Sequence, residues 1–238
     1  MTDIALHESL GHSYAQALER LHNALENAGR TQDAAKLLAV SKTKPAAMIR
    51  QVWQLGQREF GENYLQEALE KQTELTDLEG IVWHFIGPLQ SNKTRSVAEH
   101  FDWVHSVDRL KIAKRLSEQR PTHLAPLNIC LQVNISREES KAGVLPEALE
   151  ELAREVATLP NLHLRGLMAI PAPAKDISAQ RQPLAALREA FTALQSSLPD
   201  APLDTLSMGM SDDLEAAVLE GATLVRLGTA IFGARPSA

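Results

Sequence analysis

The feature that most constrains the fold is a regular alternation between short apolar runs of strand character and longer segments of helical character. The strand-like runs lie at residues 37–41, 59–63, 82–87, 103–107, 128–135, 162–170, 205–209 and 224–228. The helix-like segments lie at residues 46–55, 65–74, 93–100, 109–118, 146–158, 183–198 and 212–220. Strands that alternate with helices pair in parallel through right-handed crossovers. Eight such strands within 238 residues predict a closed (β/α)8 TIM barrel of the α/β class.

An additional helix is expected before the first strand. Apolar residues between Ile4 and Leu25 approximate helical spacing, and Gly29 offers a stop. We expect one domain over residues 1–238. A doubly wound open sheet is the alternative, but no Gly-x-Gly-x-x-Gly turn follows the first strand, as a dinucleotide-binding sheet would prefer.

Composition narrows the class of partner. Hydrophobic residues make up 44% of the chain and charged residues 23%, which suits a large buried core. The net charge of -6 argues against a nucleic-acid or anionic-membrane surface. No signal peptide or membrane-spanning run is evident, so a cytoplasmic location is expected. The single cysteine, Cys130, lacks the spacing of a metal site and fits a small core residue.

Polar residues gather where the expected strands end. In chain order these are Lys42, Asn63, His84, Ser106, Asn134, Met168, Ser207 and Arg226, with only Met168 apolar. The carboxyl ends of barrel strands open onto one mouth, where chemistry is expected. These positions are therefore the candidate site.

The last two strands are each followed by small residues leading toward a helix. Residues 207–211 follow the seventh strand, and Gly228 and Thr229 follow the eighth. Loops after strands seven and eight are the recurrent phosphate site of this barrel. Taken singly, Ser211 is also an ordinary N-cap and Gly228-Thr229 an ordinary turn. Together they predict a phosphate site.

Lys42, at the end of the first strand, has two interpretations. It can extend into solvent, or it can lose hydration in a narrow mouth, which favours the neutral, nucleophilic amine. Lys44, two residues later, fits a solvated loop charge. A reactive amine beside a phosphate site suggests a phosphorylated carbonyl compound bound as a Schiff base. Pyridoxal 5'-phosphate (PLP) and the sugar phosphate of an aldolase both satisfy this pattern.

Arg226 helps to distinguish PLP from a sugar phosphate as the ligand. A guanidinium only donates hydrogen bonds, so beside a pyridine nitrogen it would keep that nitrogen unprotonated and weaken the electron sink that PLP enzymes use. An interior arginine paired with an acid such as Glu215 is an equal alternative. Residues 171–183 form a proline-rich segment that fits either a mobile flap or a loose surface connection.

Five stretches carry a family resemblance over nearly the whole chain. They are LLAVSKTKP, FGENYLQE, WHFIGPLQSNK, LRGLMAI and SMGMSDDLEAAVLEGATLVRLGTAIFG. Together they resemble the YggS/PROSC family of pyridoxal phosphate homeostasis (PLP-binding) proteins. The resemblance implies a barrel like the N-terminal domain of alanine racemase.

The resemblance also implies roles for individual residues. Lys42 corresponds to the cofactor lysine and Arg226 to the pyridine-side arginine. The cofactor-binding set that it implies is Lys42, Asn63, His84, Met168, Ser207, Ser211, Arg226, Gly228 and Thr229. For His84, a side chain that supports the barrel is an equal interpretation. Lys141 corresponds to a lysine suspected of a secondary contact, although a surface lysine is an equal interpretation.

The implied function is binding rather than turnover: PLP is held as a Schiff base on Lys42 and serves vitamin B6 homeostasis and delivery to apo PLP-dependent enzymes. Alanine racemases carry a second, β-rich domain that supplies a tyrosine, and this chain ends after the eighth strand. A monomer without a second-face catalyst is therefore expected. The alternatives are a fold-type III PLP enzyme, such as an amino-acid racemase, and a Schiff-base aldolase.

Overall fold

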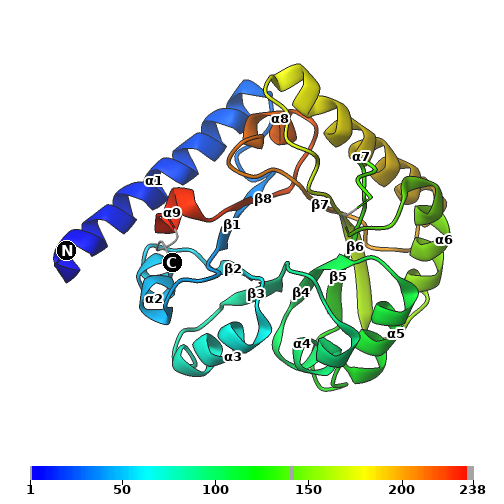
Figure 1. Ribbon diagram of the computed structural model, residues 1–238, viewed down its shortest axis with the longest axis horizontal. Coiled ribbons are helices and arrows are strands. Elements are labelled where there is room, and N and C mark those ends of the chain that lie inside the picture. Colours follow the sequence, from blue (N-terminus) through cyan, green and yellow to red (C-terminus); the bar gives the residue numbers. More distant parts are fainter. Residues whose placement is uncertain (1, 140–141, 235–238) are drawn as a thin grey trace.

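The computed structural model describes residues 2–139 and 142–234, and these form a closed barrel of parallel strands in the order β1 to β8, with β8 paired back to β1 (Figure 1). The strands are β1 Lys36–Val40, β2 Glu59–Glu62, β3 Val82–Phe85, β4 Trp103–Val107, β5 Leu127–Gln132, β6 Leu162–Met168, β7 Thr205–Ser207 and β8 Leu224–Leu227. Each expected strand is present, which confirms the barrel and excludes the open sheet. The extent of one domain over residues 1–238 stays a prediction.

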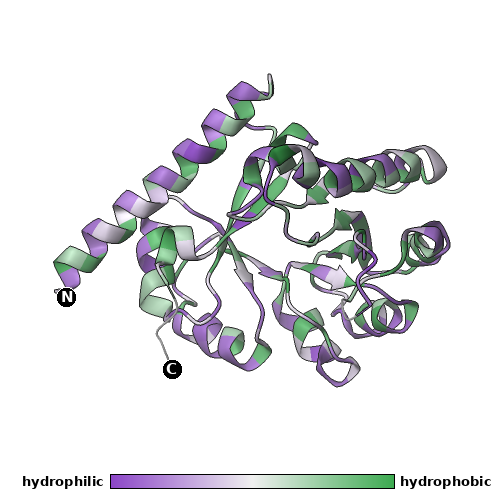
Figure 2. Cartoon of the chain, turned by 45° about the horizontal axis from the view of Figure 1, so that its top comes forward, coloured by the Kyte–Doolittle hydropathy of each residue, from purple (hydrophilic) through white to green (hydrophobic). Residues whose placement is uncertain are grey.

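Helices surround the barrel. They are α1 Asp3–Asn27, α2 Ala46–Gln54, α3 Leu65–Glu74, α4 Thr94–His100, α5 Leu110–Gln119, α6 Pro146–Ala157, α7 Ile177–Ser197, α8 Leu214–Leu219 and α9 Thr229–Phe232, with a 3-10 turn, η1, at Ser91–Lys93. The outer helices carry both hydrophilic and hydrophobic residues (Figure 2). In α5, for example, Ile112, Ala113 and Leu116 are buried and so form one apolar face toward the sheet.

The strands are apolar because both of their faces are covered. In β5, the consecutive residues Ile129, Cys130 and Leu131 are all fully buried. Side chains of successive strand residues point to opposite faces, so one face packs inside the barrel and the other under the helices. Cys130 is the core residue that its sequence context predicts.

Helix α1 is the expected additional element, and it packs against α8 and α9 outside the closed barrel (Figure 1). Its buried residues include Leu10, Tyr14 and Leu21. The Tyr14 hydroxyl donates to Gln57 Oε1 at 2.8 Å, and Arg20 forms an ion pair of 2.7 Å with Glu215. The helix therefore braces the side of the molecule where the chain's last elements lie.

Helix α7 begins earlier than the sequence predicts. It starts at Ile177, where Asp176 caps it by accepting a hydrogen bond from the Ala179 backbone, and Pro183 lies inside the helix. The expected start at Pro183 is wrong because a favourable aspartate cap comes first. The loop after β6 is accordingly shorter than predicted, and its motion as a flap stays a prediction. Helix α9 is the short helix toward which the small residues after the eighth strand lead.

In the described part of the chain, the structure contains no helix with the length and apolar character needed to cross a membrane.

Candidate functional site

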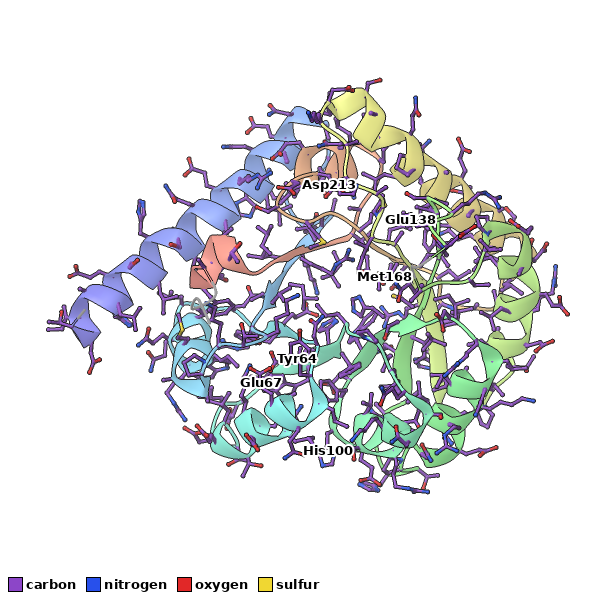
Figure 3. All side chains as sticks on the ribbon, in the orientation of Figure 1. Tyr64, Glu67, His100, Glu138, Met168 and Asp213 are labelled. Atoms are coloured by element: carbon purple, nitrogen blue, oxygen red, sulfur yellow. The ribbon has the colours of Figure 1, made fainter. Side chains whose placement is uncertain are left out.

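The strand ends bring most of the predicted residues to one end of the barrel. Lys42 follows β1, Asn63 follows β2, Met168 ends β6, and Gly228 and Thr229 follow β8. Met168 lies near the centre of the barrel in Figure 3, with Asp213 and Glu138 farther out. Segments far apart in the sequence therefore share the mouth that the strand order predicts.

Lys42 and Lys44 have different surroundings. Lys42 is half-buried in the turn after β1, and Thr43 takes a left-handed backbone conformation with φ 65°. Lys44 is 8% exposed, and its Nζ donates to the carbonyl oxygen of Ala234 at 2.9 Å. The prediction of a solvated Lys44 is wrong, because this amine holds the chain's last described residue against the β1 loop.

A buried ionic group holds the residue before Lys42. Lys71 Nζ lies 2.7 Å from Glu62 Oε1 and donates to the carbonyl oxygen of Ser41 at 2.7 Å. The Ser41 hydroxyl donates to Glu62 Oε2 at 2.8 Å. We call Ser41, Glu62 and Lys71 the Glu62 cluster. Burial raises the pKa of Glu62, and the Lys71 ammonium opposes that shift.

Two buried polar atoms near the mouth have no hydrogen-bond partner among the described residues. They are Asn63 Oδ1 and Ser106 Oγ. Buried polar atoms are normally satisfied, so an orphaned pair marks a place where a polar ligand can bind. Asn63 is held closely, since a Cβ at Gly87 would lie 2.5 Å from its carbonyl oxygen. Glycine is therefore required at residue 87.

Arg226 is the cation at the base of the mouth. Its side chain is buried, Nη1 donates to Ser207 Oγ at 2.6 Å, and Nη2 donates to the carbonyl oxygen of Ala169 at 3.1 Å. Burial lowers the pKa of Arg226 to about 10, so it stays protonated at neutral pH. The alternative pairing with Glu215 is wrong, because α1 places Arg20 on that carboxylate.

Two predicted residues lie inside the barrel and contact other side chains there. His84 and Ser207 are fully buried. His84 contacts Glu59 and His105 through its two ring nitrogens, and Ser207 contacts His105 and Arg226. Both residues are therefore placed to act on the site through Arg226, and direct contact of either with a ligand stays a prediction.

The loops after β7 and β8 supply exposed small residues. Ser211 and Thr229 are exposed and Gly228 is partly so. Arg20 donates to the Ser211 carbonyl at 2.6 Å, which fixes the first loop to α1. Gly209 has φ 102°, and a Cβ there would lie 2.7 Å from Ala217 Cβ, so only glycine suits this turn. These fixed loops keep the predicted phosphate side of the mouth in place.

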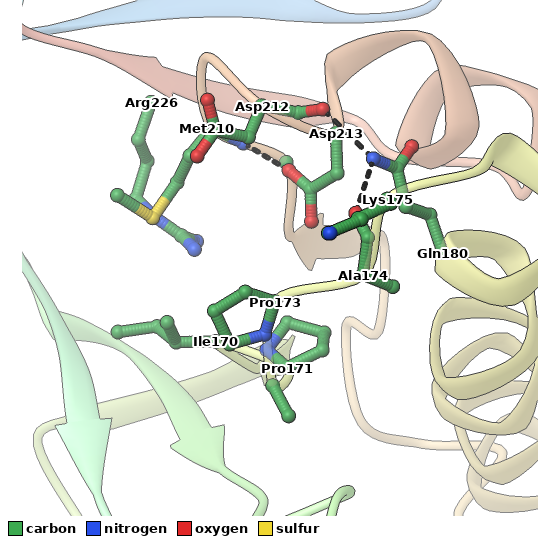
Figure 4. A pocket seen from close by; sticks show the side chains of 12 residues that line it. Ile170, Pro171, Pro173, Ala174, Lys175, Gln180, Met210, Asp212, Asp213 and Arg226 are labelled. Atoms are coloured by element: carbon green, nitrogen blue, oxygen red, sulfur yellow. Dashed lines mark hydrogen bonds between the residues drawn. The ribbon is translucent and has the colours of Figure 1, made fainter.

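A cavity of about 440 Å³ opens between the loops after β6 and β7, which is large enough for a small-molecule ligand. Arg226 and Met210 lie on one side and Ile170 and Pro173 on the other (Figure 4). Gln180 Nε2 donates to the carbonyls of Ala174 and Asp212, both at 3.0 Å, and so joins the two loops. Arg226 lines this cavity, and the other predicted site residues, all within the described part of the chain, do not.

Two features of the site were not predicted from the sequence. His105 hydrogen-bonds with both His84 and Ser207, and Lys71 reaches Glu62 from α3. Lys71 has a signal in hindsight, since a lysine is rare on the buried face of a helix. His105 has none, because its partners His84 and Ser207 come from other strands, and the pairing of β4 with β5 shifts register between Val104 and Val107. Lys141 lies outside the described residues.

Residues 16–236 match the family model described as "Alanine racemase, N-terminal domain". The match spans most of the chain, so the protein belongs to this family of barrel domains. Solved structures agree at the level of fold: alanine racemase from Corynebacterium glutamicum gives a TM-score of 0.69 at 17% identity, covering 94% of this chain and 60% of that one.

Curated relatives identify the particular branch. The chain is 61% identical to the "Pyridoxal phosphate homeostasis protein" of Pseudomonas aeruginosa, covering 95% of this chain and 96% of the relative. It is 52% identical to the protein of the same name from Escherichia coli strain K12, covering 99% and 98%. The chain therefore belongs to the family of pyridoxal phosphate homeostasis proteins.

A solved relative adds a bound molecule. The structure of PipY from Synechococcus elongatus "with PLP bound" gives a TM-score of 0.79 at 41% identity, and the alignment covers 90% of this chain and 100% of that one. The PipY structure "without PLP" gives a TM-score of 0.80 at 43% identity, covering 84% and 93%.

Proposed function

We propose that this protein binds PLP, holds it as a Schiff base on Lys42, and serves PLP homeostasis and delivery without a turnover reaction of its own. The observation that carries the proposal is that a half-buried Lys42 and a buried Arg226 lie at the same barrel mouth. The PLP-bound structure of PipY, at 41% identity, supports the same ligand.

The residues of the mouth fit this ligand. Bound PLP supplies an aldehyde that reacts with an amine, together with a phosphate and an aromatic ring. Lys42 offers the amine, and its side chain is half-buried in the turn after β1. The unsatisfied Asn63 Oδ1 and Ser106 Oγ offer hydrogen-bonding capacity that no described side chain uses.

Each side of the ligand has an assigned group in this proposal. Arg226 faces the ring side and can only donate hydrogen bonds, which opposes a proton on the pyridine nitrogen. Ser211, Gly228 and Thr229 take the phosphate on the loops after β7 and β8. Met168, which is 1% exposed at the end of β6, limits the depth of the mouth. Ser207 and His84 support Arg226 from below.

The covalent link can be tested on the purified protein. After reconstitution with PLP, we expect the visible absorbance of a protonated Schiff base, and borohydride reduction should fix the added mass on Lys42. Lys42→Ala should abolish both signals. Lys44→Ala is the matched control, because it removes the neighbouring amine of the same motif and should keep them. Protein that stays colourless with excess PLP would contradict the proposal.

Delivery needs a separate test. Holo protein should activate an apo PLP-dependent enzyme faster than free PLP at equal concentration. Equal rates would leave storage as the role. Racemisation or α-proton exchange of an amino acid at enzyme-like rates would instead favour the alternative of a fold-type III enzyme, which the shared barrel fold keeps open.

We further propose that the protein acts in the cytoplasm as a monomer, with PLP as its ligand and apo PLP-dependent enzymes as its recipients, and with no nucleic-acid or membrane partner. The net charge of -6 supports the absence of a nucleic-acid or anionic-membrane partner. Light scattering at working concentration gives the oligomeric state, and a dimer would contradict that part.

A further inference from the structure

A continuous chain of hydrogen bonds crosses the inside of the barrel and ends at Arg226. Arg226 Nη1 lies 2.6 Å from Ser207 Oγ, and Ser207 Oγ lies 2.8 Å from His105 Nδ1. His105 Nε2 lies 2.8 Å from His84 Nδ1, and His84 Nε2 lies 2.9 Å from Glu59 Oε1. We call these five residues the Arg226 relay. It joins the first residue of β2 to the mouth through β3, β4, β7 and β8.

The two ends of the relay set the direction of every bond within it. Arg226 can only donate, so the Ser207 oxygen accepts from it and the Ser207 hydroxyl proton is left for His105 Nδ1. His105 then carries its proton on Nε2 and donates to His84 Nδ1. His84 in turn donates from Nε2 to the Glu59 carboxylate, which can only accept. Both imidazoles are neutral and share one tautomer.

The opposite direction fails at one of the two ends. Reversed tautomers would place the His84 Nε2 lone pair against the ionised Glu59 carboxylate. An additional proton on His84 would avoid that clash, but His105 would then donate to a Ser207 oxygen that already accepts from Arg226. Among the hydrogen bonds of residues 2–139 and 142–234, Ser207 Oγ has only these two partners. Its own proton would then be buried without an acceptor, which is costly.

We propose that Glu59, at the opposite end of the barrel from the mouth, is a positioning residue for Arg226. Through two neutral Nε2–H histidines, Glu59 fixes the Ser207 hydroxyl as an acceptor for the guanidinium. It thereby orients the group that faces the ligand. The ligand part of this inference rests on the proposed function. Burial supports the neutral state of His105, since it holds the pKa of that ring well below its ordinary value, and the Arg226 cation adds to the shift.

The hydrogen-bond direction is testable without any ligand. We would label the histidines with ¹⁵N and record long-range ¹H–¹⁵N correlations of the protein at pH 8, assigning the two rings with His84→Gln and His105→Gln. The expected result is a neutral Nε2–H ring at both positions. A neutral Nδ1–H ring or a cationic ring at either position would overturn the relay.

Glu59→Gln tests the positioning role. A glutamine side chain can accept or donate, so it no longer forces one direction, and we expect a mixture of histidine tautomers. With PLP we expect affinity to fall about fivefold, the scale of one net hydrogen bond, and the visible band to shift. Asp102→Asn is the matched control: it removes a carboxylate that accepts from the Trp83 backbone at 2.8 Å, outside the relay, and should change none of these signals.

The outcomes separate the two claims. If Glu59→Gln changes neither the tautomers nor the band and affinity of bound PLP, the positioning role is overturned. If no variant and no wild-type protein binds PLP, the proposed function fails, whereas the histidine spectra still decide the direction of the relay.

Discussion

The Glu62 cluster and the Arg226 relay both hold parts of the mouth, but they treat buried charge in different ways. In the cluster, Lys71 and Glu62 meet directly at 2.7 Å between β2 and α3. In the relay, three neutral side chains separate the Glu59 carboxylate from Arg226. A direct pair cancels its charges and fixes the backbone of Ser41, beside Lys42. A separated pair leaves the cation facing the site, where a ligand can use it.

Removing the cation of the cluster should have the largest effect. Lys71→Met leaves Glu62 buried and unpaired, and we expect a loss of about 3–5 kcal/mol in the free energy of unfolding at pH 7. Urea titration monitored by circular dichroism measures it. The double variant Lys71→Met with Glu62→Leu should recover most of the loss. A single variant as stable as the wild type would show that the pair does not hold this part of the fold.

The loss of stability in Lys71→Met should depend on pH in a known direction. Its unpaired Glu62 has a pKa above the ordinary value of 4.5, so the folded state binds more protons than the unfolded state. The part of the penalty that comes from the buried charge is therefore absent below pH 4.5 and grows as the pH rises. A penalty that is constant between pH 5 and pH 8 would contradict this.

Removing the cation of the relay should chiefly affect binding. Arg226→Met replaces a desolvated guanidinium by an apolar chain, so the free energy of unfolding should change little. The dissociation constant for PLP should rise about 10- to 100-fold, the range of a charged hydrogen bond. Fluorescence titration of both proteins with PLP measures it. If the affinity for PLP is unchanged and the stability falls strongly, Arg226 stabilises the fold as Lys71 does and does not bind the ligand.

His105 should make the free energy of unfolding fall as the pH falls, which is opposite to the pH dependence expected for Lys71→Met. Its folded pKa lies well below the ordinary 6.5, so below pH 6.5 the unfolded chain binds a proton that the native barrel does not. The wild type should therefore lose up to about 1.4 kcal/mol per pH unit from this group as the pH falls below 6.5. His105→Gln should flatten that slope. The exposed His123, changed to Gln, is the control and should leave it unchanged.

The smallest expected effect is a difference in stability between two serine variants. Ser41→Ala removes one hydrogen bond to Glu62 while Lys71 remains, and we expect a loss of about 1 kcal/mol. Ser106 is also buried, but its hydroxyl has no partner among the described residues, so Ser106→Ala should cost nothing. Thermal unfolding of the two variants decides this. Equal losses would mean that the Ser106 hydroxyl is satisfied within the protein.

The sequence anticipated more of the barrel than of its interior. Strand positions and parallel order follow from local patterns, because each buried strand must be apolar and each strand end is polar. The errors lie where another residue competes for the same partner or position. Asp176 caps α7 ahead of Pro183, Arg20 pairs with the Glu215 carboxylate, and the Ala234 carbonyl accepts a hydrogen bond from the Lys44 amine. Arg20 and Ala234 are far in sequence from the residues that they bind, whereas Asp176 is a local cap that competes with Pro183 seven residues later.

By itself, the sequence determined the closed barrel, its additional helix and the mouth containing Lys42 and Arg226, because periodicity and chain order fix which strand ends meet. Only the tertiary structure decided what the interior polar groups do. His84 and Ser207 resembled ligand contacts from their places at strand ends. That contact stays a prediction, and the structure adds that both side chains hydrogen-bond inside the barrel, where Arg226 at one end and Glu59 at the other leave a single direction for every hydrogen bond between them.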